Sequence, residues 1–347
     1  MLYQVSSLCW TTALLAAILA VSLTPGLPAQ DAVQKATAKA KGQRTQEALR
    51  KYERLPDLEN VPYGPHPRNV LDLWKAKSDR PTPLVVYFHP GGFSQGDKRG
   101  EQTGLSPVLL NLCLAKGISV AAANYRYSRQ APYPAPMQDS ARVIQFLRLH
   151  AKEWNLNPNA VASTGSSAGA GISLWLAFHD DLADPASTDP VKRQSTRISV
   201  AGSSNGQTTY DPREVAKIIG EENARKMSSM ALALLFGLRK DEDVMKAERA
   251  YPLFEDSSAV RRVKPGDPPI FMFYAAPMRP LTADTPQEEA MHNIRFGMYL
   301  KERMDKLGVE CVLRSVDDYP GNPNERSAKH HREMIDFFLK HFPRDAK

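Results

Sequence analysis

The spacing of apolar residues predicts strands that alternate with helices over the first half of the chain. Four stretches have the character of strands: 69–74, 83–88, 118–125 and 160–165. The first alternates as a half-buried strand does, and the others are continuously apolar, as strands buried on both faces are. Between them, 105–116 and 137–154 carry apolar residues at helical spacing. This rhythm predicts right-handed crossovers and a mostly parallel sheet with helices on both faces.

The second half of the chain continues the pattern more loosely. Three apolar runs are interpreted as further strands: 197–202, 269–274 and 309–314. Between the first two, 211–255 is rich in methionine and helical in pattern. It is interpreted either as an insertion that caps a pocket or as an ordinary crossover helix packed on the sheet. An amphipathic helix over 333–342 is expected to close the fold.

Composition allows one large α/β domain or two small ones. The 347 residues are 42% hydrophobic, which is enough for a sizeable core. The formal charge of +7 comes from scattered basic residues rather than from one run, so we expect a solvated surface and no nucleic-acid partner. Residues 30–60 are interpreted as a polar lead-in segment, and 61–347 as the α/β domain.

The first 29 residues carry no charged side chain and include an apolar run over 14–23, which helix breakers and Ala29 follow. This pattern indicates a cleaved signal peptide over 1–29, with an uncleaved anchor as the alternative. We therefore expect a secreted or periplasmic protein with no stable membrane span after cleavage. Cys113 and Cys311 would remain, and their apolar surroundings favour two buried free thiols.

A short strand runs into Gly-x-Ser-x-Gly and then into a helix of small residues. Because Gly165 and Gly169 have no side chain, the chain can turn sharply there and expose the hydroxyl of Ser167. Ser167 is therefore the candidate nucleophile. The same turn directs the start of the helix, with the N–H of Ala168, toward an oxyanion formed beside that hydroxyl.

A second motif, His-Pro-Gly-Gly-Phe at 89–93, comes directly after the buried strand 83–88. Gly91 and Gly92 let the backbone turn its N–H groups outward, because no Cβ stands in the way. The motif predicts a loop that binds an oxyanion.

Taken in this order, the motifs resemble those of the α/β-hydrolase fold. The resemblance rests on five stretches: 89–93, Asn124-Tyr125-Arg126, Asp139-Ser140-Ala141, Asn157-Pro158 and 165–169. They are similar to the carboxylesterases related to hormone-sensitive lipase and to feruloyl or acetyl-xylan esterases. The resemblance implies an eight-stranded, mostly parallel sheet, a Ser, Asp and His triad in that chain order, and no metal or organic cofactor.

The acid of such a triad is expected about four residues after the strand 269–274, and Met278 stands there. Asp284 lies further along the same loop and is the candidate acid if the loop folds back. Three other carboxylates are the alternatives: Asp211, Asp317 and Asp318.

Two adjacent histidines, His330 and His331, precede the closing helix, where the resemblance places the catalytic base. His331 shares a helix face with Ile335 and Phe338, so it is expected to point toward the sheet. His330 would then face the edge that carries the active site, but the sequence leaves both residues open. Other histidines, including His292, are interpreted as surface or packing residues.

The leading hypothesis is a secreted serine carboxylic-ester hydrolase that acts on a small-molecule or polysaccharide ester. Ser167 would attack the ester carbonyl, and His330 or His331 would move the proton. The alternative is a binding protein with a catalytically weakened hydrolase fold, which Met278 at the expected acid position suggests. A carboxylate within hydrogen-bond reach of the histidine would favour the enzyme.

Overall fold

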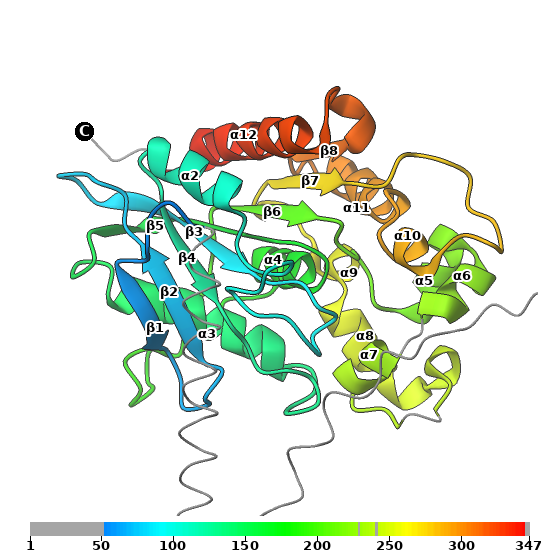
Figure 1. The fold of residues 1–347 in the computed structure, drawn as a ribbon. Coiled ribbons are helices and arrows are strands. Elements are labelled where there is room, and N and C mark those ends of the chain that lie inside the picture. Colours follow the sequence, from blue (N-terminus) through cyan, green and yellow to red (C-terminus); the bar gives the residue numbers. More distant parts are fainter. Residues whose placement is uncertain (1–51, 228–229, 240–241, 344–347) are drawn as a thin grey trace, which may run out of the picture. The chain divides into compact units, whose positions relative to one another are not determined.

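An eight-stranded sheet forms the framework of the residues that this computed structural model describes, 52–343 apart from 228–229 and 240–241 (Figure 1). The strands are β1 (Leu58–Pro62), β2 (Val70–Trp74), β3 (Thr82–Phe88), β4 (Ser119–Ala123), β5 (Leu156–Gly165), β6 (Val200–Ser204), β7 (Ile270–Tyr274) and β8 (Cys311–Ser315). Their order across the sheet is β1-β2-β4-β3-β5-β6-β7-β8. β2 runs antiparallel to β1 and β4, and the other neighbours are parallel.

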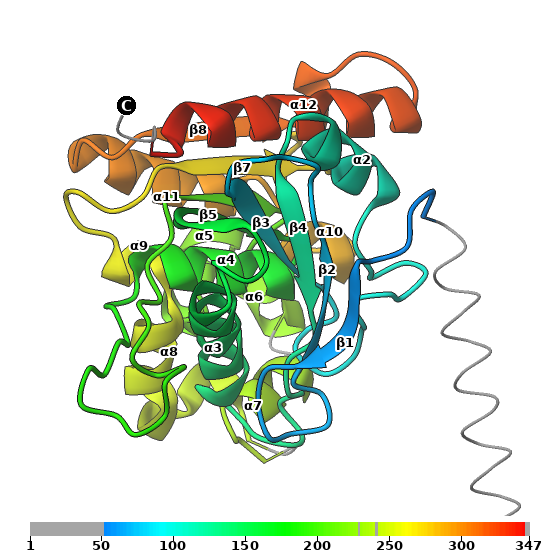
Figure 2. The same ribbon diagram turned by 90° about the vertical axis from the view of Figure 1, so that its left-hand side faces the viewer.

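Helices cover both faces of this sheet. The α-helices are α2 (Pro107–Ala115), α3 (Ala135–Leu149), α4 (Ala168–Phe178), α5 (Pro212–Ile219), α6 (Glu221–Met227), α7 (Met230–Leu235), α8 (Tyr251–Ser257), α9 (Ala259–Arg262), α10 (Gln287–Met291), α11 (Arg295–Lys306) and α12 (Pro323–His341). Short 3-10 helices are η1 (Val244–Lys246), η2 (Glu248–Ala250) and η3 (Val316–Asp318). α2 and α12 pack together on one face, whereas α3 and α4 pack together on the other (Figure 2).

Strand β3 shows why a continuous apolar run suits this sheet. Successive side chains of a strand point to opposite faces. Leu84, Val86 and Phe88 belong to the core that includes α3 and α4. Val85 and Tyr87 belong to the core beneath α2 and α12. Every position of the strand centre is therefore buried, and the predicted two-sided sheet is confirmed.

The closing helix α12 is longer than its apolar pattern predicted. It begins at Pro323 because Asn322 caps it: the Asn322 side chain accepts two backbone N–H groups, and Glu325 accepts the backbone N–H of Asn322. This reciprocal cap satisfies donors that a helix start otherwise leaves free. His330 and His331 consequently lie inside α12 rather than before it.

The strand order brings two loops together. β3 lies beside β5, and Phe88 is paired with Gly165 at their carboxyl ends. The loop 89–93 and the turn at Ser167 therefore leave the sheet side by side. In parallel sheets of this kind, ligands bind at the carboxyl edge of the strands.

Cys113 and Cys311 are free and buried, as the sequence predicted. Within the described part of the chain, no helix has the length and apolar character needed to cross a membrane. The expected signal peptide, 1–29, lies outside the described residues, as does 30–51 of the lead-in, so secretion stays a prediction.

Candidate active site

The turn between β5 and α4 holds Ser167 in a strained conformation. Its φ is 50° and its ψ is −116°, a combination that residues with a side chain rarely adopt. The turn requires glycine at positions 165 and 169, because a Cβ on either residue would overlap the carbonyl oxygen of Phe88. The backbone N–H of Ser167 also donates to the carbonyl of Ser204 on β6, 2.9 Å away. These contacts fix the hydroxyl at the tip of the sharp turn.

His292 is the imidazole that the structure brings to this hydroxyl. It follows α10, and its Nε2 lies 2.9 Å from Oγ of Ser167. Its Nδ1 lies 2.9 Å from Oε1 of Glu288, one helical turn earlier. Residues four apart share a helix face, so α10 presents the carboxylate and the imidazole together. The carboxylate favours a proton on Nδ1, which leaves Nε2 free to accept the proton of the Ser167 hydroxyl.

Burial keeps His292 neutral. Its side chain is 13% exposed, and the loss of solvent lowers the pKa of His292 below its ordinary value. The nearby carboxylate of Glu288 opposes this shift by stabilising the charged imidazole. Glu288 is 81% exposed, so solvent screens its charge and the net pKa shift is downward. His292 is therefore able to accept a proton at neutral pH.

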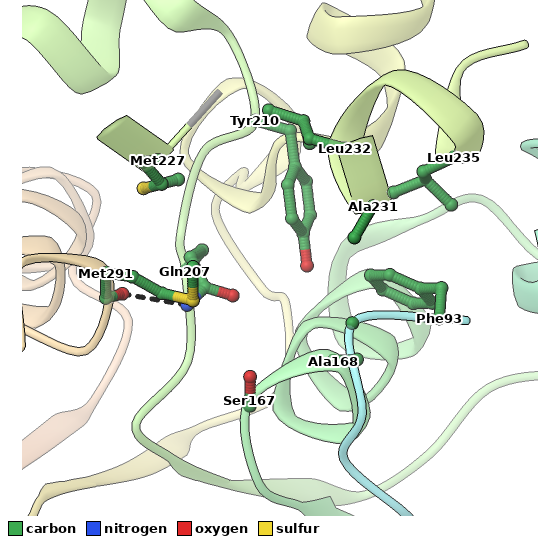
Figure 3. Close-up of a pocket in the computed structure, with 11 residues that line it drawn as sticks. Phe93, Ser167, Ala168, Gln207, Tyr210, Met227, Ala231, Leu232, Leu235 and Met291 are labelled. Atoms are coloured by element: carbon green, nitrogen blue, oxygen red, sulfur yellow. Dashed lines mark hydrogen bonds between the residues drawn. The ribbon is translucent and has the colours of Figure 1, made fainter. Parts of the chain in front are cut away.

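Contacts from two other segments hold α10 in place. The side-chain amide of Gln207, which follows β6, donates from Nε2 to the carbonyl of Met291, 2.8 Å away (Figure 3). Met291 directly precedes His292 in the chain. Arg279, which follows β7, forms an ion pair with Glu289 on the same helix. Both contacts limit the movement of the imidazole relative to the serine.

The loop after β3 has a left-handed backbone at three successive residues. The φ angles are 117° at Gly91, 56° at Gly92 and 58° at Phe93. A Cβ on Gly91 would overlap the backbone carbonyl of Gln95, so this position requires glycine. Gly92, Phe93 and Ala168 line the pocket beside the serine. Among the described residues, the N–H groups of these three lining residues have no hydrogen-bond partner, so they are available to an oxyanion.

Hydrogen bonds of His89 and Gly91 stabilise the backbone of this loop. The carbonyl of Gly91 accepts two N–H groups of the following turn. Arg68 donates to Nε2 of His89 at 3.1 Å, and because arginine has only donors, the ring proton is on Nδ1. Nδ1 donates in turn to the carbonyl of Pro90, 2.7 Å away. Burial lowers the pKa of His89 to about 4, so the ring stays neutral and serves as a structural support.

A buried ion cluster anchors the far end of the same loop. Asp72 on β2 is fully buried and accepts from Nζ of Lys98 at 2.8 Å and from Nε of Arg99 at 2.6 Å. Arg99 also pairs with Glu59 on β1 at 2.6 Å. Buried charges require partners, so the cluster ties the loop firmly to the antiparallel edge of the sheet.

A mainly apolar pocket of ≈ 60 Å³ opens beside Ser167 (Figure 3). Its lining comprises Gly92, Phe93, Ser167, Ala168, Gln207, Tyr210, Met227, Ala231, Leu232, Leu235 and Met291. α6 and α7 contribute four of these side chains, so the methionine-rich segment 211–255 forms one wall. The small volume restricts the size of a group that binds there.

The structure does not bring His330 or His331 to Ser167, which corrects the expectation from the sequence. The ring of His330 stacks on Phe273 of β7, with ring centroids 4.1 Å apart, and its Nδ1 donates to the carbonyl of Arg326 at 3.1 Å. His331 is the next residue of α12, and the two rings lie 4.0 Å apart. Burial lowers the pKa of both histidines. Both belong to the packing of α12, and neither is the partner of Ser167.

The carboxylates considered from the sequence also lie elsewhere. Asp284 is exposed on the loop after β7, in a turn closed by hydrogen bonds between Thr282 and Thr285. Met278, at the position where the acid was expected, is 61% exposed and has no acidic group to offer the imidazole. The other three accept backbone N–H groups, two of them as helix caps: Asp211, Asp317 and Asp318. The carboxylate that meets the imidazole is Glu288.

The spacing of Glu288 and His292 was the signal that could have revealed this pair. Both residues follow β7, in the region where the acid was expected, and a carboxylate four residues before a histidine on a helix places the two side chains together. The expected Ser, Asp, His order assigned the base to the region after β8 instead. Glu288 and His292 keep the order of serine, acid and histidine, but the acid is a glutamate and the histidine lies before β8 rather than after it.

The architecture and the serine turn are features of one known fold. The sheet order, the serine turn after β5 and the glycine loop after β3 are those of the α/β-hydrolase fold, which confirms the predicted fold class. Within residues 52–343, apart from the two short gaps, no group of three histidine, cysteine or carboxylate side chains is placed to hold a metal ion. The BD-FAE family model matches residues 71–277, more than half of the chain, and the chain belongs to this family.

Individual relatives agree with this placement. The chain is 28% identical over 225 residues to a probable carboxylic ester hydrolase, LipM of Mycobacterium tuberculosis, and the match covers 62% of this chain and 46% of LipM. The chain thus spans about half the length of that relative. Its fold is similar to that of an acetyl ester-xyloside bifunctional hydrolase from Caldicellulosiruptor lactoaceticus, with a TM-score of 0.61, 19% identity and coverage of 83% of this chain and 97% of the other.

A second solved structure, the esterase Est2 from Thermogutta terrifontis, has a TM-score of 0.57 and 19% identity, and the match covers 84% of this chain and 95% of that one. At this identity the two solved structures show the shared fold alone. Together with the family match, the relatives confirm the resemblance to the carboxylesterase branch of the α/β-hydrolases.

Proposed function

We propose that this protein is a serine carboxylic-ester hydrolase in which Ser167 is the nucleophile, His292 the base and Glu288 the acid. The observation that carries the proposal is the 2.9 Å contact between Oγ of Ser167 and Nε2 of His292, with Glu288 on the opposite side of the ring. Such a chain of groups activates a hydroxyl that is a weak nucleophile by itself. The presence of this carboxylate favours the enzyme over the binding-protein alternative.

In the first half of the reaction, Oγ of Ser167 attacks the ester carbonyl while its proton passes to Nε2 of His292. The imidazole becomes positively charged, and the carboxylate of Glu288 stabilises it without itself being protonated. Negative charge develops on the carbonyl oxygen. The N–H groups of Gly92, Phe93 and Ala168 are available to hold that charge.

Acylation is complete when His292 gives the proton to the departing alcohol and the acyl group stays on Ser167. Deacylation is the second half of the reaction. A water molecule then attacks the acyl-enzyme, with the neutral His292 again accepting a proton. The resulting tetrahedral intermediate collapses as His292 returns the proton to Oγ of Ser167, which releases the carboxylic acid and restores the serine hydroxyl. Because the pKa of His292 is lowered, the neutral form that both halves require is present at neutral pH.

Two broader features are part of the same proposal. The small pocket favours short acyl groups, and the resemblance of the sequence motifs to feruloyl and acetyl-xylan esterases supports acyl esters of polysaccharides as one source of substrate. The sequence of residues 1–29 supports secretion or export to the periplasm.

A fluorophosphonate probe tests the proposal without knowledge of the natural ester. The probe reacts with activated serines, so we expect stoichiometric labelling of Ser167 in the folded protein, located by peptide mass spectrometry. Prior unfolding should abolish labelling, because the hydrogen bond to His292 exists only in the fold. A folded wild-type protein that stays unlabelled would remove the enzyme from consideration and restore the binding-protein alternative.

Replacing Glu288 with glutamine should lower kcat by about 10- to 100-fold. This loss is smaller than that of a buried triad acid, because solvent screens the exposed carboxylate. The variant also loses the interaction that raises the pKa of His292, so that pKa falls further. Since activity requires neutral His292 and is lost as the pH falls through its pKa, the acidic limb of the pH–kcat/KM profile should move to lower pH.

Glu302→Gln is the control for this change. Glu302 is an exposed glutamate of α11 that pairs with Lys306 rather than with the imidazole. We expect its acidic limb to coincide with that of the wild type. An acidic limb in Glu288→Gln that stays in place or moves upward would exclude Glu288 as the acid.

A further inference from the structure

The hydroxyl of Tyr210 is a buried polar group without a partner in the described part of the protein. Tyr210 is 4% exposed, and its ring packs against Phe93 and Phe236. Its hydroxyl oxygen lies directly against Gly171 of α4, where a Cβ would overlap it, and no hydrogen bond satisfies it. Burial raises the pKa of Tyr210, so the group remains a neutral O–H donor. A donor left unpaired in an apolar site is costly unless a ligand uses it.

This hydroxyl points into the pocket beside Ser167 (Figure 3). Gln207 directs a second polar atom to the same space. Only the NH₂ group of its amide can donate to the carbonyl of Met291, so that bond fixes the amide orientation and turns Oε1 toward the pocket (Figure 3). The apolar walls therefore enclose one donor and one acceptor in addition to the reacting serine.

The position of His292 indicates which part of an ester enters this pocket. His292 must protonate the departing alcohol, so the alcohol lies on the α10 side of Ser167. Phe93 and Ala168 line the pocket together with three residues of α7, whereas α10 contributes Met291 alone. The enclosed space is thus the acyl side of the site.

Building on the proposed serine esterase, we propose that the pocket selects short acyl groups that carry a hydroxyl. The O–H of Tyr210 donates to the substrate hydroxyl, and that hydroxyl donates to Oε1 of Gln207. A hydroxyl can do both at once, whereas an ether or ketone satisfies only the donor and a plain alkyl chain satisfies neither. Tyr210 and Gln207 are then specificity-determining residues, and Gln207 also positions α10.

The test compares 4-nitrophenyl butyrate with the 4-nitrophenyl esters of 2- and 3-hydroxybutyrate, each as separate enantiomers. Each kcat/KM is divided by the rate of the same ester with hydroxide, which removes the difference in intrinsic reactivity. We expect wild-type protein to prefer at least one hydroxybutyrate by about tenfold or more. Tyr210→Phe should abolish that preference, so that the normalised kcat/KM of each hydroxybutyrate falls to that of butyrate measured on the same variant, because phenylalanine has no hydroxyl to donate.

Tyr251→Phe is the matched control, since Tyr251 is a partly buried tyrosine that does not line the pocket. It should keep the wild-type preference. Two results would overturn this inference: equal changes of kcat/KM for all esters in Tyr210→Phe, or a wild type that prefers none of the hydroxybutyrates. In either case, butyrate hydrolysis and fluorophosphonate labelling would still support the esterase. Failure of both labelling and hydrolysis would overturn the proposed function itself, and the acyl preference with it.

Discussion

Ser167→Ala is expected to lower kcat for 4-nitrophenyl butyrate by about 10⁶-fold, to the level that oxyanion stabilisation and binding alone provide. The substitution removes only Oγ, so no other group can form the acyl-enzyme. Alanine meets the same backbone strain as serine at φ 50°, and its Cβ already has a place in the turn. The fold should therefore survive. Steady-state hydrolysis, fluorophosphonate labelling and thermal unfolding measured on one preparation test all three statements.

The neighbouring serine offers a control with the same chemical change. Ser166 precedes the nucleophile and is paired with Ser204 through the backbone, which alanine preserves. Ser166→Ala should keep kcat within about threefold of wild type, as substitutions away from the reacting groups usually do. A Ser167→Ala protein that retains a tenth of wild-type activity would exclude Ser167 as the nucleophile.

His292→Ala should lower kcat by about 10⁴-fold or more, because the hydroxyl of Ser167 loses the group that accepts its proton. The loss should exceed that of Glu288→Gln, since the imidazole exchanges the proton directly whereas the carboxylate only orients and stabilises it. His292 directly follows the short helix α10 and is not part of the sheet, so we expect the remainder of the fold to persist. Activity that returns when imidazole is added to the assay would identify the missing base directly.

His330→Gln separates the base in the structure from the base that the sequence suggested. His330 stacks on Phe273 and accepts no proton from Ser167 in this fold. Its replacement should lower the thermal stability, since a buried ring is lost, but leave kcat of the folded fraction nearly unchanged. The opposite pattern, with kcat lost in His330→Gln and retained in His292→Ala, would overturn the assignment of His292.

Local residue patterns were sufficient for much of the architecture. Continuous apolar runs identified the buried strands, because a strand covered on both faces needs apolar side chains at every position. Gly165 and Gly169 indicated the serine turn, since that turn leaves no space for a Cβ against Phe88. Gly91 indicated the loop for the same reason. These features depend on the chain within a few residues of each position, so sequence carries them.

The triad partners depend on a different kind of information. Many carboxylates and histidines occur in the chain, and an exposed Asp284 or a packed His330 has the same local sequence character as a catalytic one. The choice among them is set by where α10 lies relative to the serine turn. That position follows from the bond between Gln207 and Met291 and from the pairing of Arg279 with Glu289, contacts that join segments distant in the sequence.

Residue patterns alone predicted the mostly parallel sheet, the nucleophile candidate Ser167 and the glycine loop, because steric requirements at glycines and the two-residue period of strands are local. Packing in three dimensions selected His292, with Glu288 behind it, as the partner of Ser167, rather than His330 or His331 and Asp284. It also decided that Tyr210 places an unpaired hydroxyl in the pocket. The physical reason is the same in both cases: catalytic and binding contacts act over about 3 Å between side chains that long stretches of chain separate, so they exist only after the helices have packed.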